Sequence, residues 1–326
     1  MKLTVVIPTY NSQETIIRAI DSCLSCIKSI EIVVVDDASQ DQTIQTVKDN
    51  YNQLIKSGHI KVIIANHAGA GNARNIGIMN ASSEWVTFLD SDDEFLDLVR
   101  VVDDLNKKNI ASFNIINYLF DYGKTSDDKM YAISARSLTK DNLGISSRNS
   151  CVWDSGPCSK VFKKSFLLKN NIKFPVNIKI GEDQVFNQKC LQTNIKILII
   201  NHPIYKIIEN KNSITHVIIK QKVVDDTIKL VMEVQKLKLS SSLIQAFVAK
   251  NFILLLVRFL KSNKKTKEII VSLKKYKSTF PLQNDLIIFY NLRLCLGSIV
   301  SLVGYLIWLN PEFLIILRPL MTKVRY

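Results

Sequence analysis

Glycine and proline are scarce in this chain of 326 residues, which contains only 10 Gly and 7 Pro. Collagen-like and low-complexity architectures need far more of both residues, so these classes are excluded. Apolar residues make up 47% of the sequence, which supports a sizeable core and excludes an intrinsically disordered chain. At roughly 100–200 residues per domain, the length allows two domains, or one large domain with an extension.

The few cysteines lack the surroundings of a disulfide framework or a zinc site. Met1 and Lys2 lead into a short apolar stretch that Pro8 interrupts, so we expect no secretory signal and free thiols in a reducing compartment. Cys23-x-x-Cys26 could be redox-active or half of a zinc site, but no second Cys-x-x-Cys or His pair lies near it. We therefore interpret both cysteines as structural.

Acidic residues are scarce only in the last third of the chain. Residues 1–200 carry 23 basic and 22 acidic side chains, whereas residues 201–326 carry 20 basic and 7 acidic ones. Nearly all of the formal net charge of +14 therefore lies in that last third. A basic segment of this kind indicates a phosphate-bearing partner, which could be nucleic acid, an anionic lipid headgroup or a phosphorylated substrate.

The first ninety residues alternate between predicted strands and predicted helices. The strands cover residues 3–7, 32–35, 61–64 and 85–89, and the helices cover residues 16–27, 42–55 and 72–80. This order predicts an α/β fold with a doubly wound, mostly parallel sheet flanked by helices. In such sheets ligands bind beyond the carboxyl ends of the strands. The polar residues that follow those ends are Thr9, Asn11, Asp36, Asp37, Asn66, Asp90 and Asp92.

Two short motifs in this region bear on chemistry. Asp90-Ser91-Asp92 follows an apolar strand, and two carboxylates so spaced can hold a hard divalent cation that neutralises phosphates. The alternative is a structural helix cap. Gly69-x-Gly71 superficially matches the dinucleotide-binding fingerprint, but the third glycine is replaced by Arg74 and the motif follows the third strand. That interpretation is therefore rejected.

Four segments together carry a family resemblance. They are residues 6–11, 33–39, 66–77 and 88–93. In order and spacing they resemble the family 2 glycosyltransferases with a GT-A fold, which transfer a sugar from a nucleotide-diphosphate donor with inversion. The resemblance extends to about residue 215. It implies a GT-A catalytic domain over residues 1–218, with a nucleotide-binding half (1–110) and an acceptor-binding half (111–218).

The resemblance also implies roles for individual residues. The expected nucleotide-sugar-binding set is Pro8, Thr9, Tyr10, Asn11, Asp37, Asn66, Arg74 and Asp90. Within it, Asp37 would accept from a uracil N–H, and Arg74 would reach the base or the phosphates as a fork-shaped donor. Asp90 would face the ribose or the metal, and Asp92 would bind Mn²⁺ or Mg²⁺ that bridges the diphosphate.

The acceptor half carries a second set of motifs. Trp153 and the segment 159–167 resemble the family's acceptor-side segment, and Glu182-Asp183 matches its Glu-Asp motif. Asp183 would be the base that deprotonates the acceptor hydroxyl, and Glu182 a neighbour that positions the acceptor. The alternative is a pair that caps the following helix. His216 could be a metal or phosphate ligand, or a solvent-exposed loop histidine.

The C-terminal region, residues 219–326, is predicted to be helical, basic and membrane-associating. Its lysines lie beside apolar stretches, which suits an anionic membrane surface; a solvated helical domain for oligomerisation is the alternative. It shows no RNP-type or helix-turn-helix signature, so nucleic acid is not expected. The uncharged residues 294–311 would form a helix of about 27 Å, against a hydrocarbon core of roughly 30 Å. We interpret them as an amphipathic or monotopic element, with a buried helix or a membrane span as alternatives.

The resemblance therefore implies an inverting, metal-dependent hexosyltransferase that uses a UDP-linked sugar and Mn²⁺ or Mg²⁺. We expect a glycan or lipid-diphosphate-linked acceptor, a role in cell-surface polysaccharide synthesis, and a cytoplasmic, peripheral position at the inner face of the membrane. Homo-oligomerisation stays open. The rival classes are a nucleotide-sugar pyrophosphorylase, whose Gly-rich loop after the first strand is missing here, and a catalytically silent membrane-associated scaffold.

Overall fold

The computed structural model describes residues 1–120, 130–134, 156–178, 180–193, 195–208, 221–239, 241–260, 265–282 and 298–315. Trp153 and His216 lie outside the described residues, so their predicted roles stay predictions. One compact unit contains the described residues of Met1–Ala135, Val152–Asn177 and Glu182–Lys211. The other contains those of Arg136–Cys151, Ile178–Gly181 and Asn212–Tyr326. The domain boundary expected near residue 218 remains a prediction.

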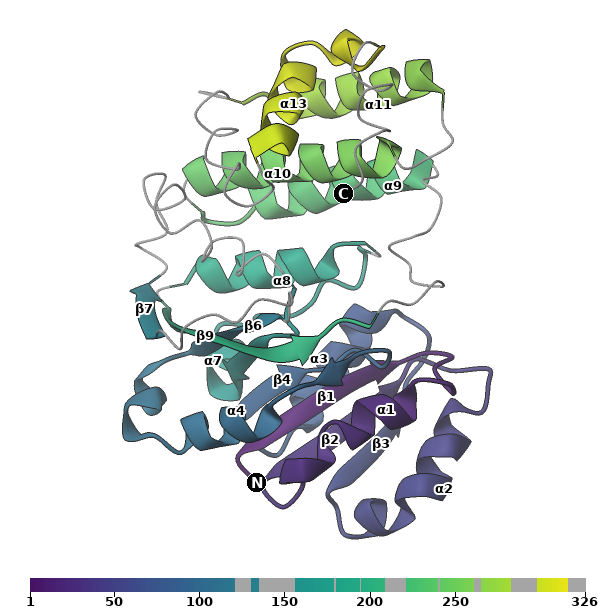
Figure 1. Cartoon of the computed structure of the whole chain (residues 1–326), viewed down its shortest axis with the longest axis vertical. Coiled ribbons are helices and arrows are strands. Elements are labelled where there is room, and N and C mark those ends of the chain that lie inside the picture. The colour runs from purple at the N-terminus through teal and green to yellow at the C-terminus, as the bar shows by residue number, and fades with distance from the viewer. Residues whose placement is uncertain are drawn as a thin grey trace. The chain divides into compact units, whose positions relative to one another are not determined.

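The first unit is built on one sheet, which has nine strands among the described residues (Figure 1). The strand order is β3-β2-β1-β4-β8-β6-β9-β5, and β7 pairs with β9. The strands are β1 (Leu3–Thr9), β2 (Ile30–Asp36), β3 (Ile60–Ile64), β4 (Trp85–Phe88), β5 (Glu94–Phe95), β6 (Ile115–Phe120), β7 (Met130–Ser134), β8 (Lys160–Lys163) and β9 (Lys196–Lys206).

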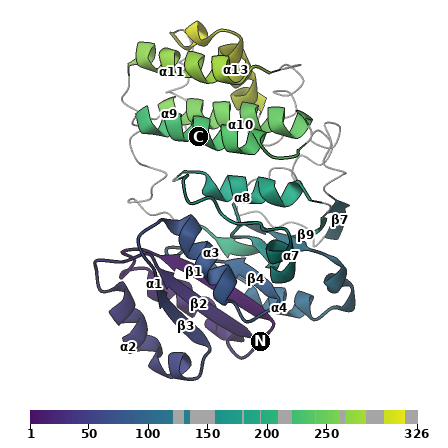
Figure 2. The ribbon, with the colours of Figure 1, turned by 180° about the vertical axis from the view of Figure 1, so that it is seen from behind.

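The first ninety residues follow the predicted alternation of strands and helices. The strands β3, β2, β1 and β4 are parallel, and every residue of β1 and β2 is buried. Burial on both faces accounts for the apolar runs 5–7 and 32–35 within these strands. The connecting helices are α1 (Ile16–Asp21), α2 (Thr43–Lys56) and α3 (Ala70–Asn80). Figures 1 and 2 show α1 and α2 on one face of the sheet and α3 on the other.

The helix predicted over residues 16–27 is shorter than expected. It ends at Asp21, and a short 3-10 turn, η1 (Leu24–Cys26), follows. The Ser22 hydroxyl donates to the Ala19 carbonyl and accepts from the Phe95 backbone N–H. A serine that bonds in this way competes with continued helical hydrogen bonding. It also ties the end of α1 to β5.

The strand order reverses beside β1, and doubly wound sheets form their ligand crevice at such a reversal. From β1 the chain steps outward to β2 and β3 and then crosses to β4 on the other side of β1. β4 pairs with β1 only as far as Val6, so Pro8 and Thr9 extend beyond it and pair with β2 alone. Ligands of doubly wound sheets bind at such a switch point, beyond the carboxyl ends of the strands.

A glycine sets the distance of α3 from the sheet. A Cβ atom added to Gly77 would lie 2.2 Å from Cγ1 of Val6 on β1, a distance that no real contact allows. Because the side chain is absent, α3 packs directly on the central strand. The first turn of α3 is thereby held at the crevice.

An aromatic cluster attaches α8 (Glu182–Leu191) to the sheet. The rings of Phe174 and Phe186 stack with centroids 3.8 Å apart, and Phe88 on β4 meets both edge-on at 5.4 and 6.2 Å. Phe162 on β8 completes the cluster. Such ring pairs add about 0.5–1.5 kcal/mol each beyond their buried area. The start of α8 is therefore rigidly placed relative to β4.

The remaining strands form a mixed half of the sheet. β8 runs antiparallel to both β4 and β6, and β6 runs parallel to β9. β5 and β7 are both antiparallel to β9. The helices α4 (Leu98–Leu105) and α7 (Lys164–Lys169), together with the 3-10 turn η2 (Lys108–Ser112), connect this half.

The second unit is helical, as predicted. It contains α9 (Gln221–Gln235), α10 (Ser241–Leu260), α11 (Thr266–Thr279), α13 (Ser298–Leu309) and the 3-10 turn η5 (Pro311–Phe313). Trp308 of α13 is buried and meets Phe252 of α10 edge-on at 4.8 Å, while the Tyr276 hydroxyl donates to the Val248 carbonyl at 2.9 Å.

The burial of Trp308 favours the buried-helix alternative for the described part of residues 294–311, although Leu302 and Leu309 of the same helix are exposed. Among the described residues, no helix combines the length and the apolarity that a membrane span requires.

Candidate functional site

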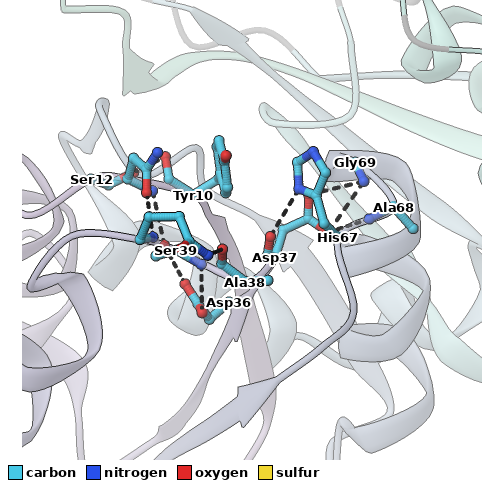
Figure 3. A network of polar contacts seen from close by, with 11 residues as sticks. Tyr10, Ser12, Asp36, Asp37, Ala38, Ser39, His67, Ala68 and Gly69 are labelled. Atoms are coloured by element: carbon cyan, nitrogen blue, oxygen red, sulfur yellow. Dashed lines mark hydrogen bonds and ion pairs between the residues drawn. The ribbon is translucent and has the colours of Figure 1, made fainter.

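The loops that follow β1 and β2 are bonded to each other at the crevice (Figure 3). The Asn11 backbone N–H donates to the Ser39 hydroxyl at 2.9 Å, and the Ser12 N–H donates to Thr43 Oγ1 at 2.7 Å. Asn11 and Ala38 have φ angles of +50° and +63°. For alanine this conformation is costly, and such strain persists only where the surroundings impose it. The loops therefore form a preshaped edge.

Asp37 organises the entry to α3. Its carboxylate accepts from the backbone N–H groups of Ala68 at 2.7 Å and Gly69 at 2.9 Å, and His67 Nδ1 lies 2.9 Å from Oδ2 (Figure 3). Asp37 is buried, and its negative charge stabilises the amino end of a helix. The contact of Asp37 with a nucleobase stays a prediction.

Two exposed rings face each other at this edge. The ring centroids of Tyr10 and His67 are 4.7 Å apart with an interplanar angle of 36° (Figure 3). Tyr10 is 45% exposed, so a flat base can stack on its outer face. The sequence reasoning singled out Tyr10 but assigned no role to His67, because its ring partner depends on how two loops meet.

Arg74 joins the Asp90 loop to the Glu182-Asp183 pair. Its Nη2 lies 2.7 Å from Asp90 Oδ1 and its Nη1 lies 3.0 Å from Glu182 Oε1. The Arg74 side chain is 7% exposed, and its guanidinium lies 5.5 Å from the centroid of the Phe174 ring. The expected contact of Arg74 with the base or phosphates stays a prediction.

Burial and charge act against each other around Arg74. Burial disfavours the charged guanidinium, but Asp90 and Glu182 outweigh this effect and hold the pKa of Arg74 above its ordinary value. Burial raises the pKa of Glu182, with Arg74 opposing the shift and Asp183 reinforcing it. The cation thus keeps together carboxylates that come from distant parts of the chain.

Two further residues shape the segment around Glu182. The Asn75 side chain donates to the Phe174 carbonyl and accepts from the Phe174 N–H, both at 2.9 Å. A Cβ atom on Gly71 would lie 3.1 Å from both Glu182 Cγ and the Pro175 carbonyl oxygen. The first turns of α3 therefore support the Phe174 segment directly, and a larger residue at position 71 would displace Glu182.

Tyr205 of β9 also holds the Asp90 loop in place. The Tyr205 hydroxyl accepts from the Asp90 backbone N–H at 3.2 Å and donates to Asp93 Oδ2 at 2.8 Å, while Asp93 Oδ1 accepts from the Ile208 N–H at 2.9 Å. Burial raises the pKa of Asp93 to about 6, the bonds from Ile208 and Tyr205 oppose the shift, and Asp90 and Asp92 add to it. Sequence reasoning missed Tyr205, which no motif marks.

Asp90 and Asp92 offer hard oxygen donors for a divalent cation. The Asp90 side chain is 36% exposed, Asp92 is partly exposed, and Arg18 donates to the Asp92 carbonyl oxygen. Within the described part of the chain, no three His, Cys, Asp or Glu side chains cluster tightly enough to hold a metal. Carboxylate oxygens of this kind fit a hard divalent cation such as Mn²⁺ or Mg²⁺.

The other expected site residues lie along the same edge. Pro8 and Thr9 are buried at the end of β1, and Asn66 is exposed in the loop between β3 and α3. Asp183 lies in the first turn of α8, where its Oδ1 accepts from the Gln184 N–H at 2.8 Å. This contact is compatible with helix capping as well as with catalysis.

A family model described as "Glycosyl transferase family 2" matches residues 4–169. This chain belongs to glycosyl transferase family 2. The match covers all four segments that carry the resemblance, and it includes β8.

Curated relatives are similar to about three fifths of the chain. The poly(ribitol-phosphate) beta-N-acetylglucosaminyltransferase TarS of Staphylococcus aureus (strain Mu50 / ATCC 700699) is 29% identical over 215 residues, which cover 63% of this chain and 35% of TarS. The poly(ribitol-phosphate) beta-glucosyltransferase of Bacillus spizizenii is 32% identical over 206 residues, covering 58% and 29%. The chain thus spans about a third of the length of these relatives.

A solved structure extends the likeness to nearly the whole chain. The crystal structure of S. aureus TarS 1-349 in complex with UDP-GlcNAc has a TM-score of 0.66 and 21% sequence identity, and the match covers 94% of this chain and 89% of that one. At this identity the likeness shows the fold alone. The predicted GT-A fold with a helical C-terminal region is confirmed.

The raised pKa of Asp93 makes the stability of this family 2 chain pH-dependent. Because the pKa rises from 3.8 to about 6, the folded chain keeps a proton that the unfolded chain has lost between these values. The free energy of unfolding of the wild type, relative to Asp93→Asn, should therefore fall as the pH rises from about 4 to about 6. Urea unfolding of both proteins across this window measures the difference, and a difference that does not change with pH would contradict the assignment.

Proposed function

We propose that this chain is an inverting glycosyltransferase that moves a sugar from a UDP-sugar to a hydroxyl of a cell-surface polymer. The observation that carries the proposal is the Arg74 bridge, which brings Asp90 and Glu182 together at the switch point of the sheet. Family membership supports the reaction class. The complex of TarS with UDP-GlcNAc supports UDP as the nucleotide of the donor.

The donor would bind along the edge formed by the loops after β1, β2 and β4. The exposed ring of Tyr10 suits stacking with the base, and Asp37 lies in the adjacent loop, where it would accept from the uracil N–H. Arg74 and the Asp90 loop lie where the phosphates would follow. The UDP-sugar would therefore bind with its uracil ring beside Tyr10 and Asp37 and its diphosphate beside Asp90.

Asp90 and Asp92 would hold the divalent cation together with the donor diphosphate. When bound, the cation would neutralise the negative charge that develops on the leaving diphosphate. Two carboxylates in one short loop, without a third ligating side chain among the described residues, support a cation that arrives with its nucleotide.

Asp183 would accept the proton of the acceptor hydroxyl. The acceptor oxygen attacks the anomeric carbon from the face opposite the diphosphate, so the new C–O bond forms as the bond to the diphosphate breaks. Glu182 is engaged by Arg74 at 3.0 Å, which supports a positioning role for Glu182 and leaves the base role to Asp183.

The acceptor is proposed to be a polyol-phosphate or glycan polymer of the cell surface. The two curated relatives share poly(ribitol-phosphate) in their names but differ in the sugar, which is N-acetylglucosamine in one and glucose in the other. This pattern supports an acceptor class more firmly than a particular donor sugar. A lipid-diphosphate-linked glycan is the second acceptor compatible with the same chemistry.

The rival classes have less support. A pyrophosphorylase needs a phosphate-binding loop after the first strand, and the loop after β1 is instead bonded to Ser39 and Thr43. A silent scaffold would have no need for the Arg74 bridge between two sets of carboxylates.

The predicted catalytic base can be tested by an isosteric substitution. Asp183→Asn should lower the transfer rate by at least about 100-fold, because the amide cannot accept the hydroxyl proton. Binding of UDP-sugar, measured by calorimetric titration with Mn²⁺, should stay within a few-fold of wild type. The exposed Asp49 on α2 provides the matched control, since Asp49→Asn should change neither quantity.

A wild-type transfer rate in Asp183→Asn would overturn the assignment of the base. The same titration with EDTA in place of Mn²⁺ tests the proposed metal dependence. Unchanged donor affinity together with unchanged transfer in the absence of metal would contradict it.

We also propose that the basic helical unit binds an anionic membrane surface at the inner face of the cell membrane. Several of its lysines are engaged within the unit: Lys275 pairs with Asp225 at 3.1 Å, Lys274 pairs with Glu312 at 2.5 Å, and Lys277 donates to the Leu309 carbonyl at 2.9 Å. The ion-paired lysines remain about half exposed, so lipid phosphates can still reach them.

In a flotation assay at low salt, the full-length chain should float with vesicles that contain anionic lipid and stay at the bottom with zwitterionic vesicles. Raising the salt concentration should reverse the binding, because it screens exposed charges. Equal flotation with both vesicle types, or none with either, would contradict this membrane contact.

A further inference from the structure

A fully buried lysine lies beside the proposed acceptor site. Lys160, the first residue of β8, has no exposed surface, and its Nζ lies 2.5 Å from the carbonyl oxygen of Gly156. Burying an ammonium group is unfavourable unless hydrogen bonds and charges compensate it. The hydrogen bond to Gly156 therefore offsets part of this unfavourable burial, and it holds the Gly156 carbonyl in place.

The Gly156 carbonyl also accepts a hydrogen bond from α8, the helix that carries Asp183. The Asn187 side-chain amide donates to the Gly156 oxygen at 3.1 Å, and Asn187 is also fully buried. Asn187 follows Asp183 by four residues on α8, so both side chains lie on one face of that helix. Gly156 is thus held between β8 and the face of α8 that presents the proposed base.

Gly156 lies directly against the Asp183 carboxylate. A Cβ atom added to Gly156 would be 3.3 Å from Asp183 Oδ2, and Gly156 has a φ angle of +83°, a region that side chains rarely allow. Glycine meets both requirements at once, since it adopts positive φ without strain and leaves the space beside Oδ2 open.

We propose that Gly156 and Lys160 are positioning residues for acceptor deprotonation, in which Lys160 fixes the Gly156 backbone and that backbone sets the direction of the Asp183 carboxylate. This inference rests on the proposed role of Asp183 as base. Neither residue touches the reacting atoms.

Misplacement of the Asp183 carboxylate should slow deprotonation of the acceptor and leave donor binding unchanged. A base must lie about 2.6–3.2 Å from the oxygen whose proton it takes, and a misplacement of about 1 Å can cost on the order of 100-fold in rate. The Gly156 carbonyl accepts from Lys160 and Asn187, and the Lys160 carbonyl accepts from the Thr87 hydroxyl, so these bonds lie among β4, β8 and α8. Their loss should therefore lower kcat for transfer while the affinity for the UDP-sugar is retained.

Gly156→Ala is the first test, with Gly58→Ala as its matched control. Gly58 has a φ angle of +77° and nothing within 4 Å of an added Cβ atom, so this control imposes the same backbone strain far from Asp183. Gly156→Ala should lower kcat by about 10- to 100-fold, with the Kd for UDP-sugar within about threefold of wild type. Gly58→Ala should keep both at the wild-type level.

Lys160→Met is the second test, because it keeps an apolar chain and removes the ammonium. Lys189→Met is its control, because the Lys189 Nζ donates to the backbone carbonyl of Lys173 at 3.0 Å. Lys160→Met should lower kcat by about 10-fold with donor affinity retained, and Lys189→Met should not. Thermal melts of all four variants establish the temperature at which each is folded, and if Lys160→Met does not fold, the Gly156→Ala comparison decides.

Wild-type kcat in Gly156→Ala would overturn the inference, as would an equal loss in Gly58→Ala or a parallel loss of donor affinity. The separate Asp183→Asn variant tells the two proposals apart. If Asp183→Asn is inactive while Gly156→Ala is unimpaired, only this inference fails. If Asp183→Asn is active, the proposed base itself is wrong.

Discussion

The Arg74 guanidinium between Asp90 and Glu182 is the interaction on which the arrangement of the site depends. It joins the first turns of α3, the loop after β4 and the start of α8, and Arg74 and Glu182 are 108 residues apart in the sequence. Removing one partner of a buried ion pair typically costs about 3–5 kcal/mol, because the other charge is left unpaired. The proposed donor and acceptor sides are therefore not independent of each other.

The surrounding packing makes this ion pair geometrically feasible. Gly77 lets α3 approach the central strand, Gly71 leaves room for Glu182, and the Asn75 amide fixes the backbone of Phe174. The stacked rings of Phe174 and Phe186 then hold α8 against β4. The proposed position of Asp183 follows from this chain of contacts, with Gly156 as its last member.

The fold and the region of the candidate site follow from sequence patterns, whereas the contacts within the candidate site do not. Buried parallel strands such as β2 read as apolar runs, and polar motifs at their carboxyl ends mark an edge of the sheet. Pairings such as Tyr205 with Asp93, or Tyr10 with His67, depend on which distant segments meet, and no local pattern records that. The burial of Trp308 was likewise not predictable, because an uncharged helix has the same sequence pattern whether other helices or lipid cover it.

A double-mutant cycle on Arg74→Met and Glu182→Gln tests the central interaction most directly. Arg74→Met leaves the Glu182 carboxylate without its partner, and Glu182→Gln leaves Arg74 with Asp90 alone. The double variant removes both charges of the Arg74–Glu182 pair, so the unfolding free energies should not be additive. From urea unfolding of the four proteins, we predict a coupling energy of about 1–3 kcal/mol between the two side chains. A coupling energy within about 0.3 kcal/mol of zero would contradict the claim that this ion pair joins the two halves of the site.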